Sequence, residues 1–382
     1  MKRLAPIRTP LAVLIVAIGG CDALPGGTTG LVQTFPRTIA WQPITIGVGG
    51  NALPTAITVA DVNVDGLPDV IVGYPGTDAA GPAITIFFQV TPTQWQPVQI
   101  ISGPAATGVQ AVAAADISGD GRPDIIAAGN GQILYLRSGE NPLNAIEWSA
   151  DVIAQSAGEG LGQWTDVAIQ QIDGLFGVDL VASNAQPGRV SWFRAPQNAI
   201  TGTNWQRLDI DAADRTGAAA IVVVDVNRDG NADVISAARD ESEASLVWYR
   251  HPGGAVDPAD VWERRTIGNL PDAARLASGD LNRDGLLDVL ALSPSQRRIA
   301  WYAQPVDVLT GGWSGVVLTE LVSNTPVDLA TLDADANGQP DVVVGTANQG
   351  TLRWFTPLND VRTGWIENNL ADLELNVGDH IV

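Results

Sequence analysis

The chain has 382 residues, 45% of them hydrophobic, and a formal net charge of −21. Its only lysine is Lys2, so it offers no basic stripe to a nucleic acid and would be repelled by anionic lipid. Cys21 is the only cysteine, which excludes a disulfide bond within the chain. The two histidines, His251 and His380, and the shortage of other catalytic groups lead us to expect a protein that is not an enzyme.

The first twenty residues have the composition of an export signal. A positively charged start precedes an apolar run at residues 11–18, which is much shorter than the roughly 20 residues a helix needs to cross a bilayer. This pattern predicts a secretory signal peptide. The run ends in Ile18-Gly19-Gly20-Cys21, which resembles the lipobox of bacterial lipoproteins, in which the cysteine is lipidated and becomes the first residue.

We therefore expect residues 1–20 to be a lipoprotein signal peptide and Cys21 to be lipidated. Residues 21–38 are rich in Gly, Pro and Thr, which predicts a flexible tether. The mature protein would be exported to a bacterial envelope and held at a membrane by its N-terminal lipid. It would face the periplasm or the cell surface.

Residues 39–382 are expected to form a single domain, because they repeat with a period of about 54 residues. An aspartate-rich motif of nine residues begins at residues 61, 116, 225, 280 and 333, and a decayed copy begins at residue 171. Successive copies start 55, 55, 54, 55 and 53 residues apart. Tryptophans keep the same period, with a Trp-Tyr or Trp-Phe pair about 20 residues after four of the motifs.

Each repeat contains four short apolar runs rich in β-branched residues, which predict β-strands. In the first repeat these runs are residues 56–60, 69–73, 83–87 and 96–100. Four strands in about 54 residues are typical of a propeller blade, whereas a sandwich domain needs about 100 residues. We therefore expect an all-β fold, a β-propeller of four-stranded blades.

The number of blades is open between seven and six. Six repeats carry a motif position between about residues 52 and 369. Residues 31–36, 41–46 and 375–379 resemble further strands, and a closing blade built from both termini would remove an open sheet edge. We favour seven blades, six complete and one closing, with six as the alternative.

The motif D-x-[DN]-x-D-G-x-x-D predicts a Ca²⁺ loop, with side-chain oxygens at positions 1, 3, 5 and 9 and a glycine that permits a sharp turn at position 6. It lacks the Glu at position 12 and the flanking helices of an EF-hand. A metal-free Asp/Gly turn is the alternative. We expect about five Ca²⁺ sites, and the predicted ligands are Asp61, Asn63, Asp65, Asp69, Asp116, Ser118, Asp120, Asp124, Asp225, Asn227, Asp229, Asp233, Asp280, Asn282, Asp284, Asp288, Asp333, Asp335, Asn337 and Asp341.

On these motifs, the repeats resemble the FG-GAP/VCBS family, found in the propellers of integrin α-chains and in many exported bacterial proteins. The resemblance covers about residues 52–369, although the Phe-Gly and Gly-Ala-Pro signatures of the family are not evident. It implies that each loop joins the first two strands of a blade and that calcium has a structural role on one face of the ring. The decayed copy departs from the motif at Gln171 and Leu175, so metal binding is not extended to it.

A binding module for a carbohydrate or protein ligand is the function these features favour, in a protein we expect to be monomeric. The alternatives are a structural scaffold for protein interactions in the cell envelope and a polysaccharide-degrading enzyme. Tryptophans at periodic positions are expected to pack between blades. Trp164 lies outside both periodic series and is our candidate for a ligand contact, while His251 is expected in an exposed loop.

Overall fold

The computed structural model describes residues 44, 46–47, 54–76, 82–102, 106, 108–129, 131–155, 162–198, 204–212, 215–240, 244–254, 256–257, 260–320, 325–335, 337–347, 351–358 and 364–372. The predicted signal peptide, Cys21, the tether and His380 lie outside these residues. No helix in the described part of the chain is long and apolar enough to span a membrane.

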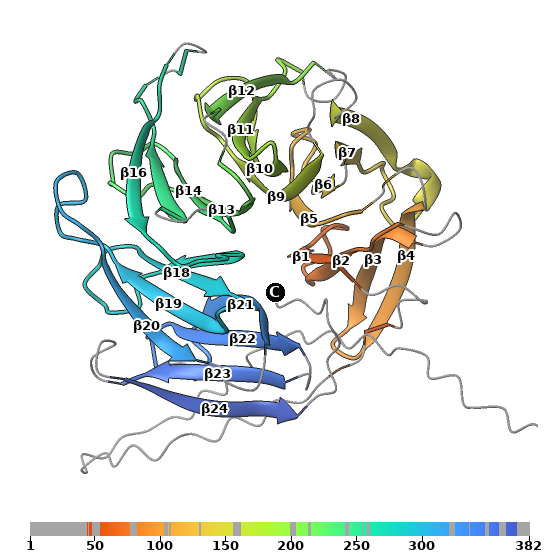
Figure 1. Cartoon of the computed structure of the whole chain (residues 1–382). Helices are drawn as coiled ribbons and strands as arrows, with labels where there is room; N and C mark the ends of the chain where they lie inside the picture. The colour runs from red at the N-terminus through yellow and green to blue at the C-terminus, as the bar shows by residue number, and fades with distance from the viewer. Residues whose placement is uncertain are drawn as a thin grey trace, which may run out of the picture.

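The described residues form six antiparallel sheets of four strands, arranged as blades around a centre (Figure 1). Each blade uses four consecutive strands, and each strand pairs with the next one in the chain. Blade 1 is β1–β4, blade 2 is β5–β8, blade 3 is β9–β12, blade 4 is β13–β16, blade 5 is β17–β20 and blade 6 is β21–β24. The predicted all-β propeller of four-stranded blades is therefore confirmed.

The first strand of each blade lies nearest the centre, and the fourth lies at the outer edge (Figure 1). The first strands are β1 (Ala56–Ala60), β5 (Ala111–Ala115), β9 (Gln163–Gln170), β13 (Ala218–Val224), β17 (Arg275–Gly279) and β21 (Thr325–Leu332). The second strands are β2 (Asp69–Gly73), β6 (Asp124–Gly129), β10 (Asp179–Gln186), β14 (Asp233–Ala238), β18 (Asp288–Ser293) and β22 (Asp341–Ala347).

The third strands are β3 (Pro82–Thr91), β7 (Gln132–Arg137), β11 (Arg189–Arg194), β15 (Leu246–Arg250), β19 (Arg298–Ala303) and β23 (Thr351–Pro357). The fourth strands are β4 (Gln94–Ser102), β8 (Ser149–Gln155), β12 (Gln206–Asp211), β16 (Glu263–Gly268), β20 (Ser314–Glu320) and β24 (Trp365–Asp372). A single turn of 3₁₀ helix, η2 (Ala145–Glu147), precedes β8.

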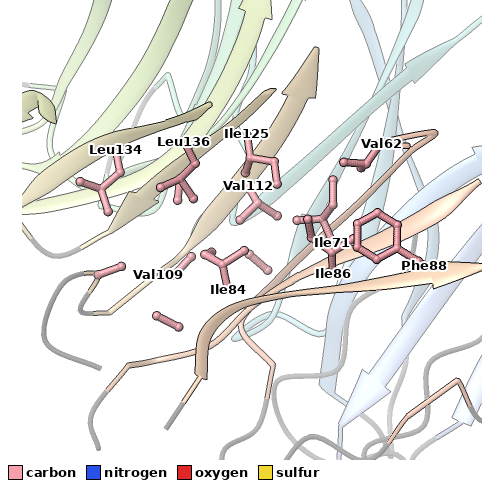
Figure 2. Close-up of a cluster of buried hydrophobic side chains, with 14 residues drawn as sticks. Val62, Ile71, Ile84, Ile86, Phe88, Val109, Val112, Ile125, Leu134 and Leu136 are labelled. Atoms are coloured by element: carbon pink, nitrogen blue, oxygen red, sulfur yellow. The ribbon is translucent and has the colours of Figure 1, made fainter. Parts of the chain in front are cut away.

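The second strands are the most buried elements, because the faces of two neighbouring blades cover them. Every residue of β2, β6, β14, β18 and β22 is buried. Successive side chains of a strand point to opposite faces. Ile71 of β2 therefore packs toward blade 2, in the cluster that Figure 2 shows with Ile84, Ile86 and Val112, whereas Val70 packs on the other face of blade 1.

Hydrophobic clusters of this kind join blade 1 to blade 2 and every following pair up to blades 5 and 6. Between blades 6 and 1 the described residues form two separate clusters instead. One lies on blade 1 and includes Ile46, with Ile44 packed against it, and the other lies on blade 6 around Trp354.

The described blades number six, the alternative given from the sequence, and not the favoured seven. Of the segments expected to form a closing blade, residues 31–36 and 375–379 lie outside the described residues, as does most of 41–46. The open side of blade 1 does carry Ile44 and Ile46, at the end of the predicted 41–46 strand.

Candidate functional site

The aspartate motifs form loops that all lie between the first and second strands of a blade, at the same end of the first strands. We number them loop 1 (61–69), loop 2 (116–124), loop 3 (171–179), loop 4 (225–233), loop 5 (280–288) and loop 6 (333–341), and number positions 1–9 within each. Position 9 is always the first residue of the second strand.

The position-1 aspartate organises each of the five intact loops. Its two carboxylate oxygens accept hydrogen bonds from the backbone N–H groups of positions 5 and 6, over 2.9–3.1 Å and 2.7–2.9 Å respectively. The glycine at position 6 has φ between 80° and 90° in all five loops, which a residue with a Cβ adopts only with strain. These contacts explain why Asp and Gly recur at these two positions.

The position-9 aspartates are fully buried, unlike the other predicted ligands. In loop 1, Asp69 accepts hydrogen bonds from the Val62 N–H at 2.9 Å and from the Gln89 N–H, just before the end of β3, at 2.9 Å. Asp179 of the decayed loop 3 makes the equivalent bonds to Ile172 and Ala195. In loops 1–5, position 9 therefore ties the loop to the end of the third strand whether or not the other motif positions are present.

Burial raises the pKa of four position-9 carboxyls to about 6, although the hydrogen bonds that they accept from backbone N–H groups act to lower it. The four residues are Asp69, Asp233, Asp288 and Asp341. Such carboxylates are held ionised in a desolvated place at neutral pH. A cation beside them would offset this cost.

Loop 6 brings three carboxylates together in a way that suits a metal. Oxygens of Asp333, Asp335 and Asp341 all lie within 4.8 Å of one another. Ligand oxygens on opposite sides of one Ca²⁺ are about 5 Å apart, because each Ca–O distance is about 2.3–2.6 Å. The donor set is all oxygen, so loop 6 fits Ca²⁺, with these three carboxylates as the groups that would hold it.

Loops 1, 4 and 5 have Asn at position 3, so each brings two carboxylates and an amide near its turn. The amide nitrogens of Asn63, Asn227 and Asn282 donate to the position-5 carboxylate over 2.8–2.9 Å. Loop 2 has Ser118 there, and its position-5 Asp120 forms an ion pair with Arg122 at 2.7 Å. The structure thus places every predicted ligand within its own loop and gives loop 6 the tightest carboxylate group.

Loop 3 is closed by its own side chains. The Gln171 side-chain nitrogen donates to the carbonyl oxygens of Leu175 (3.1 Å) and Gly177. Asp173 is buried and forms an ion pair with Arg194 at 2.6 Å. An amide and a guanidinium therefore contact oxygens that a cation would contact in a calcium loop.

Two predictions about single residues were wrong. Trp164 is fully buried and packs edge-to-face on Phe193, with ring centroids 5.6 Å apart, in the cluster between blades 2 and 3. It breaks the repeat because this interface accepts a large ring, so it is not a surface contact for a ligand.

His251 is also buried, not exposed in a loop. Its Nδ1 accepts from the Gly253 N–H at 2.9 Å, so Nε2 carries the proton and donates to the Ile172 carbonyl of the preceding blade at 3.0 Å. Gln304 makes the equivalent bond to Val226 at 2.8 Å. His and Gln interchange here because both reach a neighbouring carbonyl, and burial lowers the pKa of His251.

Sequence reasoning missed a cavity of about 190 Å³ at the centre of the ring, lined by residues near the starts of five inner strands or just before them. It lies at the end of these strands opposite to the aspartate loops. Three charged residues line it, Asp166 of β9, Arg275 of β17 and Asp328 of β21. Each stands five residues before the start of its motif, where the other three repeats have Ala56, Ala111 and Ala220. This break in the repeat is the signal that would have located the cavity.

The comparisons with known proteins agree with this geometry. The family model for the FG-GAP-like repeat matches residues 61–127, 225–291 and 280–344, each spanning from one aspartate loop into the second strand of the next blade. The chain is an FG-GAP β-propeller. No curated protein matches it.

Solved structures share the fold of this FG-GAP propeller at low identity. An Agrocybe aegerita lectin that recognises non-reducing terminal N-acetylglucosamine has a TM-score of 0.59 and 15% identity, over 88% of this chain and 87% of the lectin. A proposed 6-phosphogluconolactonase from Bacteroides fragilis also has a TM-score of 0.59, with 12% identity over 87% of each chain. One from Bacteroides uniformis has a TM-score of 0.59 with 10% identity, over 88% of this chain and 89% of the other.

Proposed function

We propose that this FG-GAP propeller is a calcium-stabilised binding module, anchored by lipid at Cys21 to a membrane of the bacterial envelope and exposed outside the cytoplasm. The observation that carries the proposal is the aspartate loop, repeated with one geometry in five blades and bringing three carboxylates within 4.8 Å in loop 6. The structural role of the loops leaves the rest of the ring available to a ligand.

A carbohydrate is the first ligand class to test. The support is the fold shared with a lectin, and at 15% identity that likeness concerns the fold alone. The alternative ligand is a protein of the envelope, for which a ring with many surface loops is equally suited.

The test is a glycan array probed with the full-length protein in detergent, once in about 1 mM Ca²⁺ and once in chelator, with thermal melts recorded in both buffers. At a dissociation constant of about 10⁻⁴ M, each occupied loop adds about 1.4 kcal/mol to the free energy of unfolding. We expect a higher Tm in calcium and calcium-dependent binding to one class of sugar.

An identical Tm in the two buffers would contradict the calcium role. A blank array from protein that melts cooperatively in calcium would reject the carbohydrate ligand, and pull-down from the envelope would then test the protein ligand.

A further inference from the structure

The central cavity has the shape and polarity of a small binding site. Its volume of about 190 Å³ is below the roughly 300–1,000 Å³ typical of sites for drug-sized ligands. It suits a molecule of a few non-hydrogen atoms, or one end of a larger molecule. Apart from Gln110, its walls are small or aliphatic where they come from blades 1 and 2, and the charged residues come from blades 3, 5 and 6.

The charges in the cavity do not cancel. Arg275 lies beside Asp328, with its Nε 3.6 Å from the carboxylate Oδ1. Asp166 is the third charge. Its carboxylate accepts hydrogen bonds from the Val167 N–H at 2.8 Å and from the N–H of Ile221, on the next inner strand, at 2.9 Å. The residues that line the cavity thus carry one guanidinium and two carboxylates, a net charge of −1 at neutral pH.

The raised pKa of Asp166 agrees with this net negative charge. Burial raises the pKa of the Asp166 carboxyl to about 6, and Asp328 adds to the rise, although Arg275 and the two N–H donors act to lower it. At neutral pH the carboxylate is therefore ionised at a cost, and a bound cation would reduce that cost.

The lining selects among cations. An anion is disfavoured by the two carboxylates, and a divalent metal by the Arg275 guanidinium and by the need for six or more oxygen ligands. A quaternary ammonium needs aromatic faces, and the described residues that line the cavity include no aromatic ring. A primary ammonium, with three N–H donors for the two carboxylates, remains.

We propose that the central cavity binds a primary ammonium group through the carboxylates of Asp166 and Asp328. The group belongs either to a small free amine or to the end of a longer molecule, such as a lysine side chain. This site is separate from the aspartate loops, and it would exist whatever macromolecule the outer surface of the ring binds.

The test is isothermal titration of the full-length protein in one calcium-containing buffer at neutral pH. Ethanolamine represents a free amine, Nα-acetyl-lysine methylamide a side-chain ammonium, and tetramethylammonium a cation without N–H donors. We expect saturable binding of one or both primary amines and none of tetramethylammonium; the tighter primary amine indicates the source.

The variants Asp166→Asn and Asp328→Asn each remove one charge while keeping the shape of the side chain. Because a hydrogen bond to a charged group contributes about 1.5–3 kcal/mol, each should weaken amine binding at least about tenfold. Asp151→Asn is the matched control, since Asp151 lies on outer strand β8 and pairs with Arg137. It should leave the affinity within about twofold.

Three results would overturn the proposal: no saturable binding of either primary amine, equal affinity for tetramethylammonium, or unchanged affinity in both cavity variants. If Asp166→Asn disturbs folding through its contact with Ile221, the Asp328→Asn variant still decides, because Asp328 lies on a different blade, where its Oδ1 accepts the N–H of its own neighbour Leu329.

Discussion

At the scale of single residues, the same register position of the inner strands holds alanine in three blades and a charge in the other three. Alanine there leaves space, and Asp166, Arg275 and Asp328 face that space. The strands stay paired at this position, as for Asp166 opposite Ser183 and Ala220 opposite Ala237, and the register shifts beside the alanine Ala220 as it does beside the charged Asp166 and Asp328. A propeller can therefore carry polar groups at its centre without changing its blades.

Asp166 should make the stability of the protein depend on pH in a predictable direction. Its folded-state pKa of about 6 lies above the unfolded value of about 3.9, so the folded state holds a proton that the unfolded state releases between these values. This contribution to stability is present at low pH and is lost as the pH rises from about 4 to about 6.

The Asp166→Asn variant has no carboxyl at this position, so it should not lose stability in this way as the pH rises. We expect its free energy of unfolding, relative to the original protein, to rise by up to about 3 kcal/mol between about pH 4 and pH 7. Urea unfolding of both proteins at several pH values, in one calcium concentration, measures the difference. A difference that does not change with pH would show that Asp166 titrates as an exposed carboxyl does.

Individual residues were also where sequence reasoning was least successful. Trp164 and His251 both depart from their repeats, and both departures are explained by the neighbouring blade, which supplies Phe193 to one and the Ile172 carbonyl to the other. A repeat alignment compares equivalent positions within blades. It holds no information about which atoms lie across the interface between blades.

At the scale of the element, the aspartate loops and the strands around them could be predicted well, because their signal is periodic and local. Each loop is a turn whose N–H groups need acceptors, and Asp at position 1 with Gly at position 6 supply the acceptor and the backbone conformation. The buried role of position 9 was less evident. Its retention as Asp179 in a loop that lost the ligands at positions 1 and 5 was the available clue.

Loops 3 and 6 should respond differently to calcium. In loop 6, Asp333→Asn removes a ligand charge, so the stabilisation by about 1 mM Ca²⁺ should fall by about the 1.4 kcal/mol of one site. In loop 3, Gln171→Ala should lower stability by about 1–3 kcal/mol in calcium and chelator alike, because the Leu175 and Gly177 carbonyls lose their donor.

Thermal or urea unfolding in both buffers measures these two effects, and each variant is the control for the other. An equal loss for Asp333→Asn with and without calcium would show that loop 6 binds no metal. A calcium-dependent loss for Gln171→Ala would show that loop 3 does.

At the scale of the whole molecule, the ring has five continuous interfaces and one interrupted one. The described parts of blades 1 and 6 carry separate apolar clusters where the other blades share one. The sequence favoured a closing blade between blades 6 and 1, built from segments that resemble strands but lack an aspartate loop. A periodic motif predicts complete blades, and it cannot count a blade that does not contain the motif.

A chain that ends at residue 372 tests the closing blade. In a ring of six blades, deleting residues 373–382 should change the free energy of unfolding by no more than about 0.5 kcal/mol, whereas removing Leu375 and Val377 from a closing blade would lower it by roughly 2–5 kcal/mol. Deletion of residues 22–30 in the predicted tether is the control of similar length and should leave the Tm unchanged. An equal Tm for the 373–382 deletion would favour a ring of six blades without a closing one.

Loop 3 and the cavity belong to the same blade, since Asp166 lies on the strand that leads into Gln171. Under the proposed function, the folding of the other five blades follows the calcium concentration outside the cell, while blade 3 holds its turn with chain atoms alone. The order of loop 3 would therefore not depend on calcium. The amine site takes Asp166 from blade 3 and Asp328 from blade 6, so a fall in calcium would leave the first carboxylate in place and loosen the second, and amine binding would weaken as calcium is withdrawn.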